Sequence, residues 1–297
     1  MRKSYSIEKS QKRTPFMIGA SIVIGIYCLT LVVALGWAMF SSFKYNWDFK
    51  TDKFGWPKHG MTIENFITVL TSFQKDVTLA DGSQGSVDML GMFFYSLVYG
   101  VGGSFIGNLS RSMCAYVAAK YRHLRWPLFI HTLVLVLMTI AFPGNLAVTI
   151  KFYKMMNLYD NLFLCIFTSF GFTGANFLYF YAAYRGVSDE YREAASIDGA
   201  NQWTIMFRIM MPMVKNIFIA LFVLDFIAHW NDYTPSLVWL PRYPMVAYGL
   251  YHFKNNDYPN AVEMFACVSV VIIPTLTIFI VFKDKIVSNL SIGGLKG

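Results

Sequence analysis

The sequence predicts an all-α, polytopic membrane protein with six transmembrane helices. Charged residues make up 14% and hydrophobic residues 56% of the chain, whereas soluble domains carry about 25% charged residues. A helix needs roughly 20 apolar residues to cross the hydrocarbon core, and helix is the expected form because an open strand in lipid leaves its backbone unpaired. Six runs of that length are present, at residues 16–43, 89–110, 126–150, 161–184, 216–240 and 264–282.

Lysines and arginines are concentrated in four segments that an even number of spans places on one side of the membrane. They are Arg2, Lys3, Lys9, Lys12 and Arg13, then Lys120, Arg122 and Arg125, then Arg185, Arg192 and Arg208, and finally Lys283, Lys285 and Lys296. By the positive-inside rule this side is cytoplasmic. We therefore expect both termini in the cytoplasm and interpret the net charge of +8 as an orientation signal. No nucleic-acid partner is expected, because no basic stretch is interleaved with aromatic residues.

The expected organisation follows the chain in order. Residues 1–15 form a cytoplasmic tail, and residues 16–43 form the first helix, which is too long for a signal-peptide core. An external loop at 44–88 forms a short cap with one helix near 62–73. The domain at 89–290 holds the other five helices, and residues 291–297 form a cytoplasmic tail.

The four cysteines indicate neither a metal site nor a disulfide framework. All of them lie in or beside apolar runs and none has the spacing of a metal site. We expect them to be small packing residues. They are Cys28, Cys114, Cys165 and Cys267.

A polar segment at 188–212 separates the fourth and fifth apolar runs. Ser188 can cap a helix, and Gly199 suits the left-handed position that ends one. A second short helix from about residue 201 is then expected to present apolar side chains to water unless a partner covers them, and Pro212 starts or kinks the next helix. The apolar side chains are Trp203, Met206, Phe207 and Met210.

The same segment carries a spaced motif. Three residues separate Glu193-Ala194-Ala195 from Gly199, and nine more separate Gly199 from Ile209. One further residue lies between Ile209 and the Met211-Pro212 pair. This pattern resembles the EAA loop with which permease subunits of ABC transporters dock onto their ATPases. The family pattern prefers Leu at 211, where this chain has Met, which is a volume-conserving change.

Further matches extend the resemblance from about residue 88 to the C-terminus. They are Ala115 to Ala119, Trp230-Asn231-Asp232-Tyr233 with Pro235 and Leu237, and the tail Gly293 to Gly297. They resemble the second permease of maltose-type carbohydrate importers. The resemblance implies the six-helix type I ABC importer permease fold. It also implies a second permease, two ATP-binding subunits and an external solute-binding protein as partners.

The resemblance also implies which residues meet the ATPase. These coupling residues are Glu193, Ala194, Ala195, Asp198, Gly199 and Ala200. The glycine-rich tail is expected to make a second ATPase contact. No cofactor is expected in this chain, since it has no Walker A loop. ATP and Mg²⁺ would be bound by the partner ATPases, and the chain itself is not expected to be an enzyme.

Ionisable residues interrupt the fifth run. Asp225, His229 and Asp232 recur at helical spacing on one expected face, next to Asn231. Such groups usually face a cavity or a partner, so all four residues are candidates for a solute path or for a structural cluster against the second permease. Asp225 lies deeper and could pair with a cation of the partner. Asn145 and Asn176 could line the same cavity, although lone asparagines more often tie helices together.

Two other functions compete with the importer hypothesis. A secondary, proton-coupled transporter could use Asp225 and His229 as a relay, but such transporters usually show paired interrupted helices in two halves. No such duplication is evident. A membrane-embedded enzyme is disfavoured because no nucleophile–base pair or metal constellation is found. No motif on the chain defines a particular sugar.

Overall fold

The computed structural model describes residues 15–78, 82–140, 146–256 and 260–290, and it covers side chains except at 256 and 285–290. The chain divides into two compact units. Unit 1 comprises Met1–Ile67 and Asn260–Ser269, and unit 2 comprises Thr68–Pro259 and Val270–Gly297. Almost all of the regular structure is helical, as predicted.

Unit 1 begins with α1 (Pro15–Ser41) and α2 (Asn46–Thr51) and includes the first parts of α3 (Glu64–Ser72) and α15 (Ala261–Leu290). Most of α1 is exposed and apolar, as expected for a helix whose solvent is lipid. The end of α1 is tied to α3, because the Asn65 side-chain amide donates to the carbonyl oxygens of Ser42 and Lys44, both at 2.8 Å. This connection fixes the start of the predicted cap.

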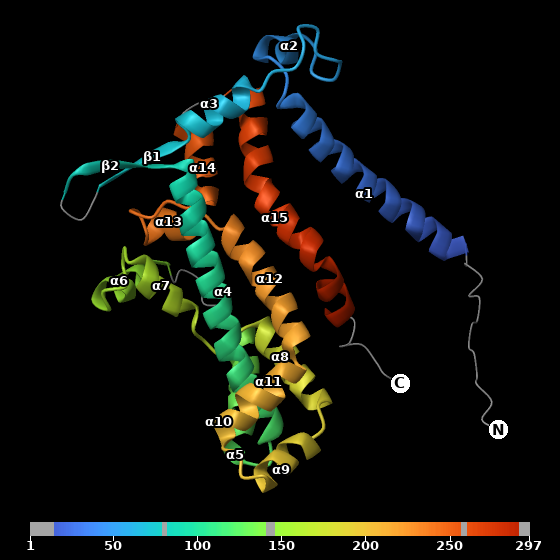
Figure 1. The fold of residues 1–297 in the computed structure, drawn as a ribbon, viewed down its shortest axis with the longest axis vertical. Helices are drawn as coiled ribbons and strands as arrows, with labels where there is room; N and C mark the ends of the chain where they lie inside the picture. Colours follow the sequence, from blue (N-terminus) through green and yellow to red (C-terminus); the bar gives the residue numbers. More distant parts are fainter. Residues whose placement is uncertain (1–14, 79–81, 141–145, 257–259, 291–297) are drawn as a thin grey trace. The chain divides into compact units, whose positions relative to one another are not determined.

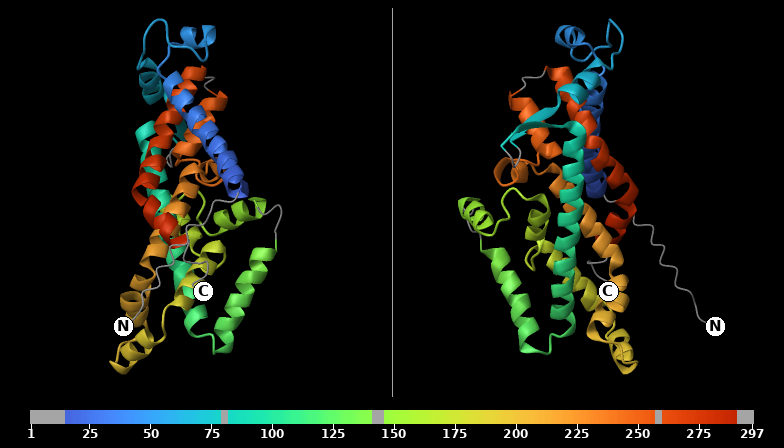
Figure 2. Two further views of the ribbon diagram at one scale, coloured as in Figure 1. Left: turned by 90° about the vertical axis from the view of Figure 1, so that its right-hand side faces the viewer. Right: turned by 60° about the vertical axis from the view of Figure 1, so that its left-hand side comes forward.

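Unit 2 is built around the long helix α4 (Met89–Lys120), which is capped by Asp88 through the amide of Gly91. Several helices contact α4 along its length, as Figures 1 and 2 show, and α14 and η1, whose bounds are given below, are among them. Four others also contact it. They are α5 (Arg125–Thr139), α7 (Leu162–Ile166), α8 (Ala175–Gly186) and α12 (Lys215–Asn231). Small residues permit the close packing: a Cβ added at Gly100 would lie 3.0 Å from the Phe226 ring of α12.

The remaining elements of unit 2 are short. They are β1 (Gln74–Thr78), β2 (Gln84–Asp88), α6 (Leu146–Met155), η1 (Phe167–Ser169), α9 (Glu190–Ile197), α10 (Gln202–Thr204), η2 (Ile205–Met210), α11 (Met211–Met213), α13 (Thr234–Val238) and α14 (Val246–Asn256). The antiparallel hairpin of β1 and β2 pairs Gln74 with Asp88. It corrects the all-α prediction within the 44–88 loop, where alternating side chains of β1 bury Val77 while its neighbours stay exposed.

The six apolar runs do not all become long straight helices. Within the described residues, three helices are long and apolar enough to span a membrane, Pro15–Ser41, Met89–Lys120 and Ala261–Asp284, and a fourth counts if Gln202–Met213 and Lys215–Asn231, bent by 77°, form one span. The third run contains α5 and α6 instead of one helix. The interval between them, 141–145, lies outside the described residues, and its sequence includes Pro143 and Gly144.

The fourth run is also broken, between η1 and α8. Gly174, before α8, has a φ of +112°. Side chains of α4 bond the backbone at the break: Ser110 Oγ lies 2.9 Å from the carbonyl oxygen of Gly171, and Arg111 Nε donates to the carbonyl oxygen of Thr173 at 2.9 Å. Non-helical backbone at membrane depth is tolerated when protein groups satisfy it in this way.

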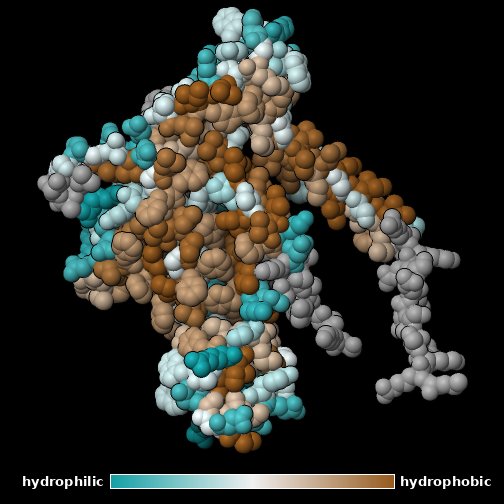
Figure 3. All heavy atoms as spheres, viewed as in Figure 1, coloured by the Kyte–Doolittle hydropathy of each residue, from teal (hydrophilic) through white to brown (hydrophobic). Residues whose placement is uncertain are grey.

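The surface of unit 2 changes in character along its length. Figure 3 shows hydrophobic colours over its middle and mostly hydrophilic colours, with apolar patches, at the end where α9 and α10 lie. This polar end carries the 188–212 segment. The four cysteines are free thiols, of which Cys165 and Cys267 are buried and Cys28 is exposed.

Candidate functional site

The 188–212 loop folds into short helices joined by a sharp turn, as its sequence predicts. Ser188 Oγ accepts from the amide of Glu190 at 3.3 Å, at the start of α9. Gly199 ends the turn after α9 with a φ of +78°, a conformation that side chains disfavour. Asn201 then caps α10 by accepting from the amide of Thr204 at 2.8 Å.

The residues of the Glu-Ala-Ala motif point in different directions. Glu193, Ala194, Asp198 and Gly199 are exposed and Ala200 is half-buried. Ala195, in contrast, is only 7% exposed and packs inside the protein. The two alanines therefore differ in their surroundings: one lies on the surface of the loop, and the other holds the loop to the helices behind it.

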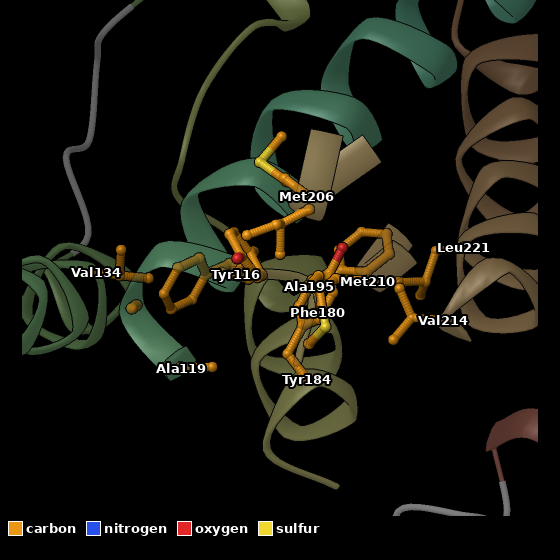
Figure 4. Close-up of a cluster of buried hydrophobic side chains, with 14 residues drawn as sticks. Tyr116, Ala119, Val134, Phe180, Tyr184, Ala195, Met206, Met210, Val214 and Leu221 are labelled. Carbon is orange, nitrogen blue, oxygen red and sulfur yellow. The ribbon is translucent and has the colours of Figure 1, made fainter. Parts of the chain in front are cut away.

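A buried cluster joins the loop to the ends of the membrane helices. Figure 4 shows side chains of α4, α5, α8, α9, η2 and α12 converging there, including Tyr116, Phe180 and Tyr184 around Ala195. Met206 and Met210 also belong to this cluster, so the prediction that they face water is wrong. They lie four residues apart and share one face, while Trp203 and Phe207 lie on the outward face.

Polar contacts fix the loop at its beginning. Lys120, the last residue of α4, is buried and donates to the carbonyl oxygen of Val187 at 2.5 Å while pairing with Asp189 Oδ1 at 2.8 Å. The hydrogen bond from Lys120 is the main cause that lowers the pKa of Asp189. The Tyr121 hydroxyl donates to the side chain of Gln202. The loop is thereby attached to α4 at two points.

The outer face of the loop leaves large apolar groups exposed among charged ones. Ile197 is 86% exposed and Trp203 is 64% exposed. The Trp203 and Phe207 rings stack at 5.9 Å with 9° between their planes, so they form a flat apolar surface. Exposed apolar surface of this kind, rimmed by polar residues, typically marks a protein interface.

A polar cluster lies deeper in unit 2, centred on Asp225 of α12. Its Oδ2 accepts from the side-chain amides of Asn108 and Asn176, each at 2.9 Å, and lies 3.7 Å from Arg111 Nη1. Asn176 also donates to Asn108 Oδ1 at 3.0 Å. Asp225 thus pairs with a cation of its own chain, and Asn176 ties α8 to α4 and α12. Asn145, the other asparagine considered for this cavity, lies outside the described residues.

Arg111 and Asn108 were not among the predicted site residues. Arg111 directly follows the uncharged stretch at 89–110, so it was not identified as part of a span. The informative signal is a charge inside one apolar helix matched by the opposite charge, Asp225, inside another.

His229 is bonded within the same region. Its Nδ1 donates to the carbonyl oxygen of Asp225 at 2.7 Å and lies 3.4 Å from Ser104 Oγ. The ring meets Tyr99 edge-on at 5.5 Å. These contacts account for one ring nitrogen and for the packing of the ring.

Asn231 and Asp232 lie at the exposed end of α12. The predicted common face of Asp225, His229 and Asp232 is wrong at its last member, because α12 ends at Asn231 and Asp232 is extended. Asp232 Oδ1 accepts from the amide of Thr234 at 2.9 Å and so turns the chain into α13. Asn231 donates back to the carbonyl oxygen of Ile227 at 2.8 Å.

Among the described residues, no group of three or more histidine, cysteine or acidic side chains could hold a metal ion. The site thus consists of an exposed apolar surface on the 188–212 loop and a hydrogen-bonded polar cluster around Asp225. The comparisons with known proteins define the class of protein.

Residues 82–291 match the model of the binding-protein-dependent transport system inner membrane component family, so the chain belongs to this family. It is 26% identical over 278 residues to the diacetylchitobiose uptake system permease protein NgcG of Streptomyces coelicolor, covering 90% of this chain and 85% of that one. It is 28% identical to the arabinooligosaccharides transport system permease protein AraQ of Bacillus subtilis, covering 69% and 73%.

A solved structure shares the fold. It is a bacterial ABC transporter involved in the import of the acidic polysaccharide alginate, with a TM-score of 0.71 at 19% identity, covering 95% of this chain and 99% of the other. The family is one of transporter components, not enzymes. None of these comparisons supports the alternative of a secondary, proton-coupled transporter.

Proposed function

We propose that this chain is one of two transmembrane subunits of an ATP-driven importer that moves a sugar or oligosaccharide delivered by an external binding protein. Membership of the binding-protein-dependent family is the main support for a role in an importer. The names of its relatives, permeases for diacetylchitobiose and for arabinooligosaccharides, support the substrate class. The chain would supply six spans with both termini in the cytoplasm.

The 188–212 loop would be the ATPase contact. Its exposed face, with Glu193, Ala194, Ile197 and Trp203, is available to a partner, while Ala195 and Met206 are held in the buried cluster. A displacement imposed on the outer face would therefore reach α4, α8 and α12 through packed side chains. ATP and Mg²⁺ would be held by the partner subunits.

The solute path would lie near the C-terminal end of α12, away from the 188–212 loop. Asn231 and Asp232 are exposed there, whereas Asp225 and His229 are bonded inside the unit. We therefore assign Asn231 and Asp232 to solute contact and Asp225 and His229 to holding the helices together. The tail at 293–297, the other proposed ATPase contact, lies outside the described residues.

The function is tested by reconstituting the chain with its second permease, the ATPases and the binding protein in vesicles. ATP hydrolysis should rise severalfold when the binding protein carries its saccharide. Ile197→Asp should abolish this rise, while Ile63→Asp, at an exposed isoleucine of unit 1, should retain it. Equal stimulation in Ile197→Asp and the unaltered chain would contradict docking through this loop.

A further inference from the structure

Two tryptophans of unit 1 border a small cavity formed by α2 and the loop that follows it. Trp47 is 74% exposed and Trp56 is 75% exposed, which is unusual for side chains that normally contribute to cores. The cavity has a volume of about 60 Å³ and opens to solvent. It is lined by Trp47, Asp48, Thr51, Asp52, Trp56, Lys58 and His59.

The floor of this cavity is a hydrogen-bonded pair of side chains, Asp48 and His59. Asp48 has a side chain only 4% exposed, and it accepts from the amide of His59 at 3.0 Å and from His59 Nδ1 at 2.5 Å. These bonds, led by the one from the His59 side chain, lower the pKa of Asp48. Since Nδ1 is committed and the His59 side chain is 67% exposed, Nε2 is the ring nitrogen left for other contacts.

The loop that carries Trp56 is also held in place. Lys44 is buried, and its Nζ donates to the carbonyl oxygens of Lys53 at 3.2 Å and Gly55 at 2.6 Å. Asp52 Oδ1 accepts from the amides of Phe54 at 3.1 Å and Gly55 at 2.8 Å. A preformed site loses less entropy on binding than a flexible one.

The chemistry of the lining selects a class of ligand. Indole rings offer flat apolar surface, and His59 Nε2, Lys58 and Thr51 offer hydrogen bonds around it. The lining contains two carboxylates and one lysine. Its formal charge is therefore −1 with His59 neutral and zero with His59 protonated, so the lining does not favour an anion. A sugar ring, with apolar C–H faces and a rim of hydroxyls, matches both parts.

We propose that Trp47 and Trp56, with Lys58 and His59, form a binding site for a neutral sugar ring on the part of the chain between α1 and α3. Tryptophans near the end of a membrane helix can also act as interfacial anchors. Interfacial anchoring would not require the hydrogen-bonded pair of Asp48 and His59 beneath the tryptophans. The presence of this pair therefore favours a ligand site over a membrane anchor. The saccharide class rests on the proposed function, but the binding itself requires neither ATPases nor transport.

The test uses the full chain in lipid nanodiscs without its partners. Tryptophan fluorescence and saturation-transfer NMR would be recorded with maltotriose and with diacetylchitobiose as probes. Saturation transfer to sugar ring protons is expected for at least one probe. Trp47→Ala and Trp56→Ala should each raise its Kd at least tenfold, whereas Trp56→Phe, which keeps a flat ring, should remain within about threefold.

Phe54→Ala is the matched control, because Phe54 is 80% exposed in the same loop but does not line the cavity. It should leave the Kd unchanged. A Lys58→Met variant, at an exposed lysine of the rim, should weaken binding without changing the melting temperature. The proposal is overturned if neither probe binds, if the tryptophan variants bind normally, or if Phe54→Ala weakens binding equally. Transport by the reconstituted complex would still test the proposed function separately.

Discussion

Asp225 shows how a single residue acquires a role that its position in the sequence leaves open. In the sequence it is an isolated acid in an apolar run, compatible with a proton relay, a solute contact or a pair with a partner's cation. In the structure, Asn108, Asn176 and Arg111 converge on one of its oxygens. These partners come from α4 and α8, about 50 to 120 positions away in sequence. Only tertiary structure could identify them.

Removing Asp225 should leave Arg111 without its charge partner. We expect Asp225→Ala to destabilise the chain by about 1–3 kcal/mol, less than for a fully buried pair because both side chains are about a quarter exposed. Arg111→Met combined with Asp225→Leu should recover part of this loss. Melting temperatures in detergent would measure both effects.

The matched control is Asp232→Asn, at an exposed residue that bonds only the neighbouring backbone. It should change the melting temperature little. If Asp225→Ala is as stable as the unaltered chain, the polar cluster does not hold the three helices together.

At the scale of elements, the apolar runs located the helices but not their breaks. The run at 161–184 has no charge and no proline, yet Gly174 interrupts it, and Ser110 and Arg111 of α4 bond the freed backbone. Likewise α12 ends at Asn231 because Asp232 bonds the following turn. The turn at Gly199 was predictable because local conformation alone requires a glycine there. The inward face of Met206 and Met210 was not, because it depends on packing against α4 and α8.

Lys120 joins two elements, α4 and the loop before α9. Lys120→Met should loosen the loop, seen as faster proteolysis between 187 and 200, because the carbonyl oxygen of Val187 and the carboxylate of Asp189 lose their donor. Arg125→Met, at an exposed cation that begins α5, is the control.

The same contact predicts a pH dependence. The native pKa of Asp189 is lowered, so its contribution is fully present above the ordinary value of 3.8 and is lost as pH falls through the lowered native pKa. Since the Asp189 side chain is 56% exposed, screening keeps this contribution below about 1 kcal/mol. The melting temperature of Lys120→Met should therefore fall less steeply below pH 4 than that of the unaltered chain. Parallel pH profiles would show that the ion pair does not stabilise the fold.

At the scale of the whole molecule, the proposed arrangement has six spans and cytoplasmic termini. Lysines and arginines near the ends of described helices, such as Lys120, Arg185 and Arg208, lie in segments expected on the cytoplasmic side. Single cysteines in a cysteine-free chain should therefore react with an impermeant maleimide in intact cells at Ser83 but not at Ser196. Labelling at Ser196 without membrane rupture would contradict the orientation.

Docking of the 188–212 loop is measured most directly by crosslinking in the assembled importer. Ile197→Cys, in a chain lacking its four native cysteines, should form a crosslink to an ATPase subunit, and ATP binding should change its yield. Ala195→Cys, two residues away but buried, should not react. No crosslink from 194, 197, 198 or 203 in a complex that still transports would contradict the assignment of this loop as the ATPase contact.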